Sequence, residues 1–75
     1  MNELTKKVLD HFYQESLTSE IYSEEFNKNS KQISKMFREK FGMNKTWMDY
    51  HDSLLKDKNK TLSLLEVMYK ELIKL

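Results

Sequence analysis

Residues 29–42, NSKQISKMFREKFG, combine an apolar stripe with a basic face and predict a short α-helix with marked ends. Ile33, Phe37 and Phe41 recur at the spacing that places side chains on one side of a helix. Gly42 follows the last turn, where glycine is favoured because it adopts a left-handed backbone without a Cβ clash. We therefore expect one face of this helix to pack into a core and the other to remain free for a ligand.

Positive charge is concentrated around this helix, although the formal net charge of the chain is only +1. Residues 1–26 carry two basic and six acidic side chains, a net charge of −4, and residues 46–75 are balanced. Residues 27–45 carry six basic side chains and one acidic side chain, a net charge of +5. This local concentration favours contact with a polyanion at one place over uniform, non-specific binding.

Length and composition indicate one small domain spanning residues 1–75. A chain of this size buries roughly 60–65% of its unfolded surface, and it has no cysteine for a disulfide or a zinc site. No segment is apolar enough for a signal region or a membrane span, so we expect a cytoplasmic protein without membrane contact. The strong preference for lysine over arginine, without proline or alanine, suggests an AT-rich genome such as that of a low-GC bacterium, its phage or its plasmid.

Helix patterns account for most of the chain and predict an all-α fold of about five helices. The first helix is expected at about residues 3–15 and the last at about 61–75. Between them we expect helices at about 19–26, 30–41 and 44–56. Only residues 56–60 resemble a linker.

The helices at about 19–26 and 30–41 are predicted to form a helix-turn-helix. Thr18 is expected to cap the first of them. Asn27-Lys28-Asn29 is expected to form the turn, because asparagine readily accepts the left-handed conformation. Ser23 supplies the small residue that a close helix crossing requires.

Residues 30–43, SKQISKMFREKFGM, resemble the recognition helix of AraC/XylS-type regulators and the Gly-Met that follows it. Four positions match the family's aliphatic residue, phenylalanine, basic residue and glycine: Ile33, Phe37, Arg38 and Gly42. The resemblance extends over residues 18–50, which correspond to one half of that regulator domain. It implies that residues 30–38 enter a major groove and that the helix at 44–56 supports them.

The basic face supplies the candidate contacts to double-stranded DNA. Five residues are expected to face the groove: Lys31, Gln32, Ser34, Lys35 and Arg38. Three are expected to contact phosphates: Lys28, Lys40 and Lys45. Gln32 and Arg38 are the candidates for reading bases, because Gln pairs with adenine and Arg with guanine through two hydrogen bonds. The sequence thus predicts a small sequence-specific DNA-binding transcriptional regulator.

The last predicted helix is apolar over more than one face. Leu65, Met68, Leu72 and Leu75 follow a 3-4-3 spacing like that of a coiled-coil seam, and Leu62 joins them as a candidate dimerisation residue. Either this helix is the central element of the core or it also pairs with a second copy of the chain. We expect a homodimer, because a wide apolar face on so small a domain favours pairing.

No catalytic constellation, metal site or cofactor motif emerges, so we expect no enzyme. Trp47 is expected to anchor the core. His51 lies near Asp49 and Asp52, and we prefer a half-buried histidine there to a metal ligand. A second function class stays open: a small phage- or plasmid-type interaction module that binds and inhibits a host protein. It would use the acidic N-terminal half or the apolar C-terminal helix.

Overall fold

The computed structural model describes all residues, 1–75, and contains four α-helices and no strand. The helices are α1 (Glu3–Thr18), α2 (Glu24–Phe41), α3 (Lys45–Ser53) and α4 (Lys58–Ile73). The predicted all-α class is confirmed, whereas the predicted number of five helices is wrong. None of the four helices has the length and apolarity that crossing a membrane requires.

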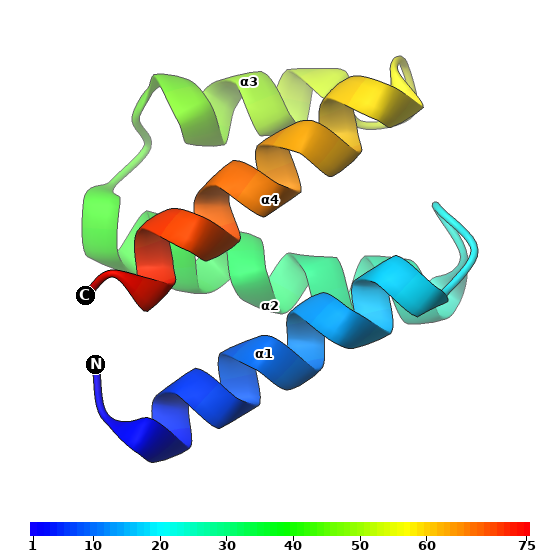
Figure 1. Ribbon diagram of the computed structural model, residues 1–75. Coiled ribbons are helices and arrows are strands. Elements are labelled where there is room, and N and C mark those ends of the chain that lie inside the picture. Colours follow the sequence, from blue (N-terminus) through cyan, green and yellow to red (C-terminus); the bar gives the residue numbers. More distant parts are fainter.

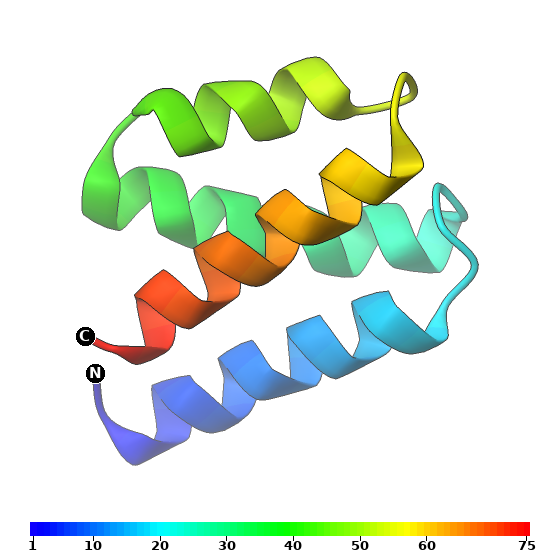
Figure 2. The same ribbon diagram turned by 45° about the horizontal axis from the view of Figure 1, so that its top comes forward.

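The helices form two hairpins, α1–α2 and α3–α4 (Figure 1). Helix α4 packs against the other three helices, while α1 and α3 lie on opposite sides of the molecule and do not touch (Figures 1 and 2). The two ends of the chain lie side by side, and the ammonium group of Met1 donates a hydrogen bond to the carbonyl of Leu75. The short helix α3 is thus held mainly by α4, and it faces α2 across a sparsely filled space.

All four helices contribute to one hydrophobic core. Its buried members are Leu9, Tyr13, Phe26, Ile33, Phe37, Tyr50, Leu65, Met68 and Leu72. Three residues of the predicted dimer seam are among them, which makes α4 the central core element and leaves these side chains unavailable to a second copy. Of the other two, Leu62 is half-buried and only Leu75 is exposed. The 3-4-3 spacing of the predicted seam is also the spacing of a core-facing stripe, and the homodimer stays a prediction.

Helix α2 begins later than the sequence predicted. The Ser23 hydroxyl oxygen accepts a hydrogen bond from the backbone N–H of Phe26 at 3.2 Å and caps the helix. Glu24 and Glu25 follow in the first turn, where the positive end of the helix dipole stabilises carboxylates. Thr18, the predicted cap, is instead the last residue of α1.

Helix α2 also continues through residues 27–29, where a turn was predicted. Asn29 is buried there, and its side-chain amide donates a hydrogen bond to the carbonyl of Glu25 at 2.9 Å. This bond to the preceding turn satisfies the amide within a helix, so the asparagine does not need a turn. The predicted helix-turn-helix at about 19–41 is therefore absent, and one long helix takes its place.

The remaining helix ends follow standard capping chemistry. The side chain of Asn44 accepts from the backbone N–H of Trp47 at 3.0 Å, which confirms the predicted start of α3. Asp57 caps α4 in the same way, so α4 begins inside the predicted linker. Gly42 has the predicted positive φ, +75°, after α2. Leu55 also has a positive φ, 64°, where the chain reverses between α3 and α4.

A buried hydroxyl group joins three parts of the chain. Oγ1 of Thr61, which is fully buried in α4, lies 2.9 Å from the hydroxyl and 3.1 Å from the carbonyl of Ser53 at the end of α3. It also lies 3.2 Å from the hydroxyl of Tyr22 in the α1–α2 connection. This contact fixes the start of α2 relative to the end of α3.

Candidate functional site

Four exposed basic side chains follow one another along α2: Lys28, Lys31, Lys35 and Arg38. At 100° per residue they fall within an arc of about 80° and span about 15 Å of the helix axis. None of them forms an ion pair, because the three ion pairs of the chain involve other lysines, on α3 and α4. We call these four residues the basic ridge.

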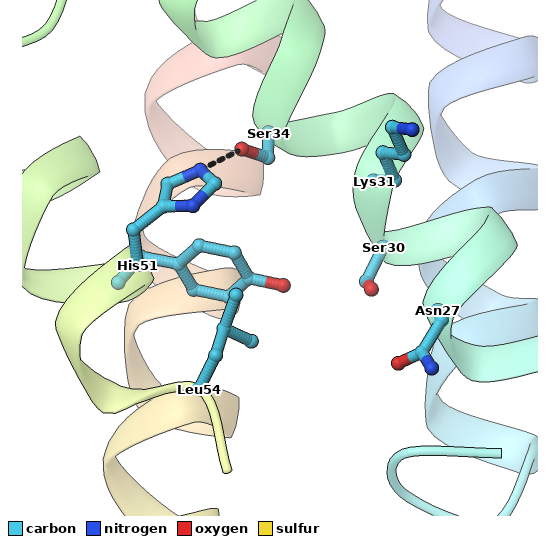
Figure 3. Close-up of a pocket in the computed structure, with 7 residues that line it drawn as sticks. Asn27, Ser30, Lys31, Ser34, His51 and Leu54 are labelled. Atoms are coloured by element: carbon cyan, nitrogen blue, oxygen red, sulfur yellow. Dashed lines mark hydrogen bonds between the residues drawn. The ribbon is translucent and has the colours of Figure 1, made fainter. Parts of the chain in front are cut away.

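A groove runs beside the ridge, between α2 and α3. It consists of two hollows of about 290 and 240 Å³ that share Lys31, Ser34 and His51. Figure 3 shows Asn27, Ser30 and Lys31 following one another along α2, opposite the labelled residues of α3. No Asp or Glu lines either hollow. We call this feature the α2–α3 groove.

His51 lies at the middle of the groove. Its Nε2 atom is 3.1 Å from the hydroxyl of Ser34, which reaches it from α2 (Figure 3). Its ring centroid is 4.0 Å from that of Trp47, with the planes tilted by 42°. Burial lowers the pKa of His51 below 6.5, and the nearby charge of Arg38 lowers it further against the opposing effect of Asp52. The imidazole is therefore mostly neutral near pH 7.

One end of the groove is cationic. Lys31, Lys35 and Arg38 line the larger hollow together with Trp47. The guanidinium carbon of Arg38 lies 5.8 Å from the centre of the Trp47 ring, within cation–π range. This contact restrains the Arg38 side chain beside Trp47. We call this part, formed by the three basic residues and Trp47, the cationic end.

The other end carries neutral hydrogen-bonding groups. Asn27, Ser30, Tyr50 and Leu54 line the smaller hollow. Burial raises the pKa of Tyr50, although a hydrogen bond with Ser30 acts in the opposite direction, so the phenol keeps its proton at neutral pH. We call this part, formed by these four residues, the neutral end.

The structure places the predicted DNA contacts in several different positions. Gln32 is half-buried and lies about 120° around α2 from Arg38, so the two predicted base readers do not project together. Ser34 is buried and bonded to His51, which excludes it from the exposed face where it was predicted. Lys40 is exposed but lies about 180° from Lys31, on the side of α2 near the chain termini.

Of the remaining predicted contacts, Lys45 is exposed at the start of α3 and pairs with Asp49 at 2.8 Å. The ridge residues are the four that are exposed, unpaired and on one face. These four therefore form the part of the predicted set that the fold brings together.

The groove residues of α3 were not predicted as a site, because the sequence did not show that α3 faces α2. A signal was present in α2. Asn27, Ser30, Lys31 and Ser34 form a polar line directly beside the apolar stripe. A line of this kind, at helical spacing on the edge of a core, indicates a polar surface that a neighbouring element partly covers.

Comparison of the chain with known protein families, curated proteins and solved structures finds no match. The resemblance to AraC/XylS-type regulators therefore stays a prediction. The function has to be inferred from the ridge and the groove themselves.

Proposed function

We propose that this chain is a small DNA-binding transcriptional regulator that places the basic ridge of α2 against duplex DNA. The observation that carries the proposal is the ridge itself: four exposed cations without ion-pair partners on one face of one helix. Like charges held this close repel one another, and a polyanion relieves that repulsion. In this proposal the single helix α2 has the recognition role that was predicted for a helix-turn-helix.

The dimensions of α2 suit this role. An α-helix fits a major groove about 12 Å wide, and the ridge covers about 15 Å of its length. The opposite side of α2 is fixed because Phe26, Ile33 and Phe37 are buried in the core. The helix can therefore meet DNA as a preformed element without the cost of ordering its backbone on binding.

The ridge residues divide into two roles. Lys28, Lys31 and Lys35 are point charges and suit phosphate contacts, which fix position without reading sequence. Arg38 has a planar group with several donors and is held over Trp47, so it is the candidate for reading a guanine. Arg38→Ala is then expected to relax the preference at one base pair, whereas Lys35→Ala weakens binding to all sequences alike.

The proposal is tested by measuring duplex affinity by fluorescence anisotropy across salt concentrations. Each phosphate contact contributes about 0.9 to the salt slope, so the three lysine contacts give a slope of about −2.7. The double variant Lys28→Gln/Lys35→Gln should reduce the slope by about 1.8. The matched control, Lys70→Gln/Lys74→Gln, removes the same charge from α4 and should leave the slope unchanged. Wild-type protein without duplex affinity at low salt would contradict the proposal.

A protein-interaction module is the second candidate. Leu4 and Val8 lie one turn apart on α1 and are 72% and 41% exposed. Exposed apolar side chains at this spacing suit contact with a protein partner. A protein-interaction module would use the acidic N-terminal half as its contact surface, because the apolar stripe of α4 lies in the core. This function would be favoured if the wild-type protein binds no duplex DNA and binds a host protein, and if Leu4→Lys abolishes that protein contact.

A further inference from the structure

The α2–α3 groove contains side chains that duplex binding by the ridge does not use. Asn27, Ser30, Tyr50 and His51 line it, and none of them belongs to the ridge. The two ends of the groove also differ in chemistry, with cations at one end and neutral donors and acceptors at the other. A ligand that fits both ends has an anionic group and a neutral, hydrogen-bonding group a short distance apart.

The cationic end suits a phosphate group. Three basic side chains line one hollow in which no carboxylate balances them. Charge-assisted hydrogen bonds from guanidinium and ammonium groups to phosphate are short and strong, and Arg38 is already restrained by Trp47. The Ser34–His51 pair forms the polar floor of the same hollow, with one hydroxyl and one imidazole at 3.1 Å.

The neutral end suits a nucleoside. Asn27 donates one N–H of its amide to the carbonyl of Tyr22 at 3.3 Å, and its amide oxygen and second N–H remain for the edge of a base. The hydroxyls of Ser30 and Tyr50 can bond to a sugar, and Leu54 supplies apolar contact for the face of a base. The two joined hollows, about 240 and 290 Å³, fall at the lower end of the size range of small-ligand sites.

We propose that the α2–α3 groove binds a nucleoside monophosphate, with the phosphate at the cationic end and the nucleoside at the neutral end. The nucleotide is either free or the terminal nucleotide of a single strand, since both present the same chemical groups. Phosphate alone would use only the larger hollow, and a nucleoside alone would leave the cations without a partner.

This site is experimentally separable from duplex binding. Lys28 belongs to the ridge and lines neither hollow, whereas Ser30 and Tyr50 line the groove and are absent from the ridge. A variant at Lys28 therefore tests the duplex proposal, and a variant at Tyr50 tests the groove. Failure of either proposal leaves the other intact.

The first test is calorimetric titration of the full chain with adenosine 5′-monophosphate, inorganic phosphate and adenosine. The nucleotide should bind at least about tenfold more tightly than either fragment, because only the nucleotide uses both ends. Nucleotide that binds no more tightly than inorganic phosphate would overturn the proposal. Absence of nucleotide binding at millimolar concentration would overturn it as well.

The second test uses three variants. Arg38→Gln should weaken nucleotide and phosphate alike, by about tenfold or more. Tyr50→Phe, which removes only the hydroxyl, should weaken the nucleotide by about two- to tenfold and leave phosphate unchanged. Lys28→Gln should change neither while it reduces the salt slope of duplex binding. Should Tyr50→Phe disturb the fold, Ser30→Ala probes the same end with a smaller change. Equal loss of nucleotide and phosphate in these neutral-end variants would show that the nucleoside is not bound there.

The source of the nucleotide is resolved with a short oligonucleotide, with and without a 5′-phosphate. Tighter binding of the 5′-phosphorylated strand than of free nucleotide identifies a strand end as the ligand. Preference for free nucleotide identifies a soluble effector. Both results support the groove as the site. Binding of both strands at equal affinity, and more tightly than free nucleotide, contradicts it.

Discussion

Thr61→Val is expected to weaken the whole fold, because it keeps the shape of the side chain and removes the hydroxyl that joins three segments. This hydroxyl is fully buried and lies at 2.9 and 3.1 Å from two oxygens of Ser53 and at 3.2 Å from the hydroxyl of Tyr22. Water cannot replace it, so each lost hydrogen bond costs about 0.5–1.5 kcal/mol.

Thr61→Val should cost less free energy of unfolding than a change that leaves buried polar groups without any hydrogen-bond partner. The Ser53 hydroxyl still donates to the carbonyl of Tyr50 at 2.7 Å, and the Ser53 carbonyl still accepts from the backbone N–H of Asp57 at 3.0 Å. We therefore expect a loss of about 2–3 kcal/mol in the free energy of unfolding. A chain of 75 residues has about 4–11 kcal/mol in total, so the loss should lower Tm by roughly 10–20 °C.

The measurement is urea unfolding followed by circular dichroism, with two controls. Thr61→Ser keeps the hydroxyl and removes one methyl group, which should cost about 1 kcal/mol. Tyr22→Phe removes one contact and should cost about 0.5–1.5 kcal/mol. In a double-mutant cycle the two sites should couple by at least about 0.5 kcal/mol. If Thr61→Val costs no more than Thr61→Ser, the hydroxyl does not join the segments.

Three further outcomes are expected. Leu55→Gly should stabilise the chain by about 0.5–1 kcal/mol in urea unfolding, because Leu55 has a φ of 64° and is 81% exposed. Leu55→Ala should give no gain in the same measurement. Burial lowers the pKa of His51, so its contribution to stability is complete above about pH 6.5 and declines as pH falls below that value. The free energy of unfolding should therefore decline from about pH 7.5 to about pH 5, and His51→Gln should remove this decline. Asp49 and Glu66 stay ionised over this range because their pKa values are lowered. Phe37→Ala should cost about 3–5 kcal/mol because its ring is buried, and an exposed-site control such as Lys35→Ala should unfold in urea like the wild type.

The sequence predicted the elements whose signals are local. The core-facing side chains of Ile33 and Phe37 in α2, the start of α3 near residue 44 and the positive φ of Gly42 all depend on residues within one or two turns. The start of α2 was misplaced because two capping signals compete: Thr18 and Ser23 both precede acidic residues. Only tertiary packing selects between them, since Phe26 has to reach the core.

The larger error is the turn predicted at residues 27–29, which α2 replaces. Asn29 was assigned to a turn from its preference for the left-handed conformation, a preference that applies when the residue is exposed and its amide can bond locally. In the folded chain Asn29 is buried, and its amide donates a hydrogen bond to the carbonyl of Glu25. This bond satisfies the buried amide inside the helix. Burial of this residue depends on contacts with other helices, and no pattern within residues 27–29 encodes them.

The candidate site could be predicted only on the side formed by α2. The charge of the ridge follows directly from the spacing of four residues on one helix. The groove also requires α3, and the position of α3 follows from its packing on α4. The sequence alone therefore predicted the α3 residues as core or surface residues and not as part of a site. Trp47, for example, was expected to anchor the core, but it is half-buried, packs against the core from outside and lies tilted against His51 at the edge of the groove.

The way α3 is attached links the groove to the stability of the fold. Helix α3 packs mainly on α4, and the 3.1 Å contact between Ser34 and His51 is one of the few side-chain hydrogen bonds that join it to α2. A ligand in the groove would contact both helices and add bonds where the protein has few of its own. A ligand at one hundred times its Kd stabilises the folded state by about 2.7 kcal/mol. That is comparable with the loss expected for Thr61→Val, so an occupied groove should offset the absence of the Thr61 hydroxyl, which joins α4 to the end of α3.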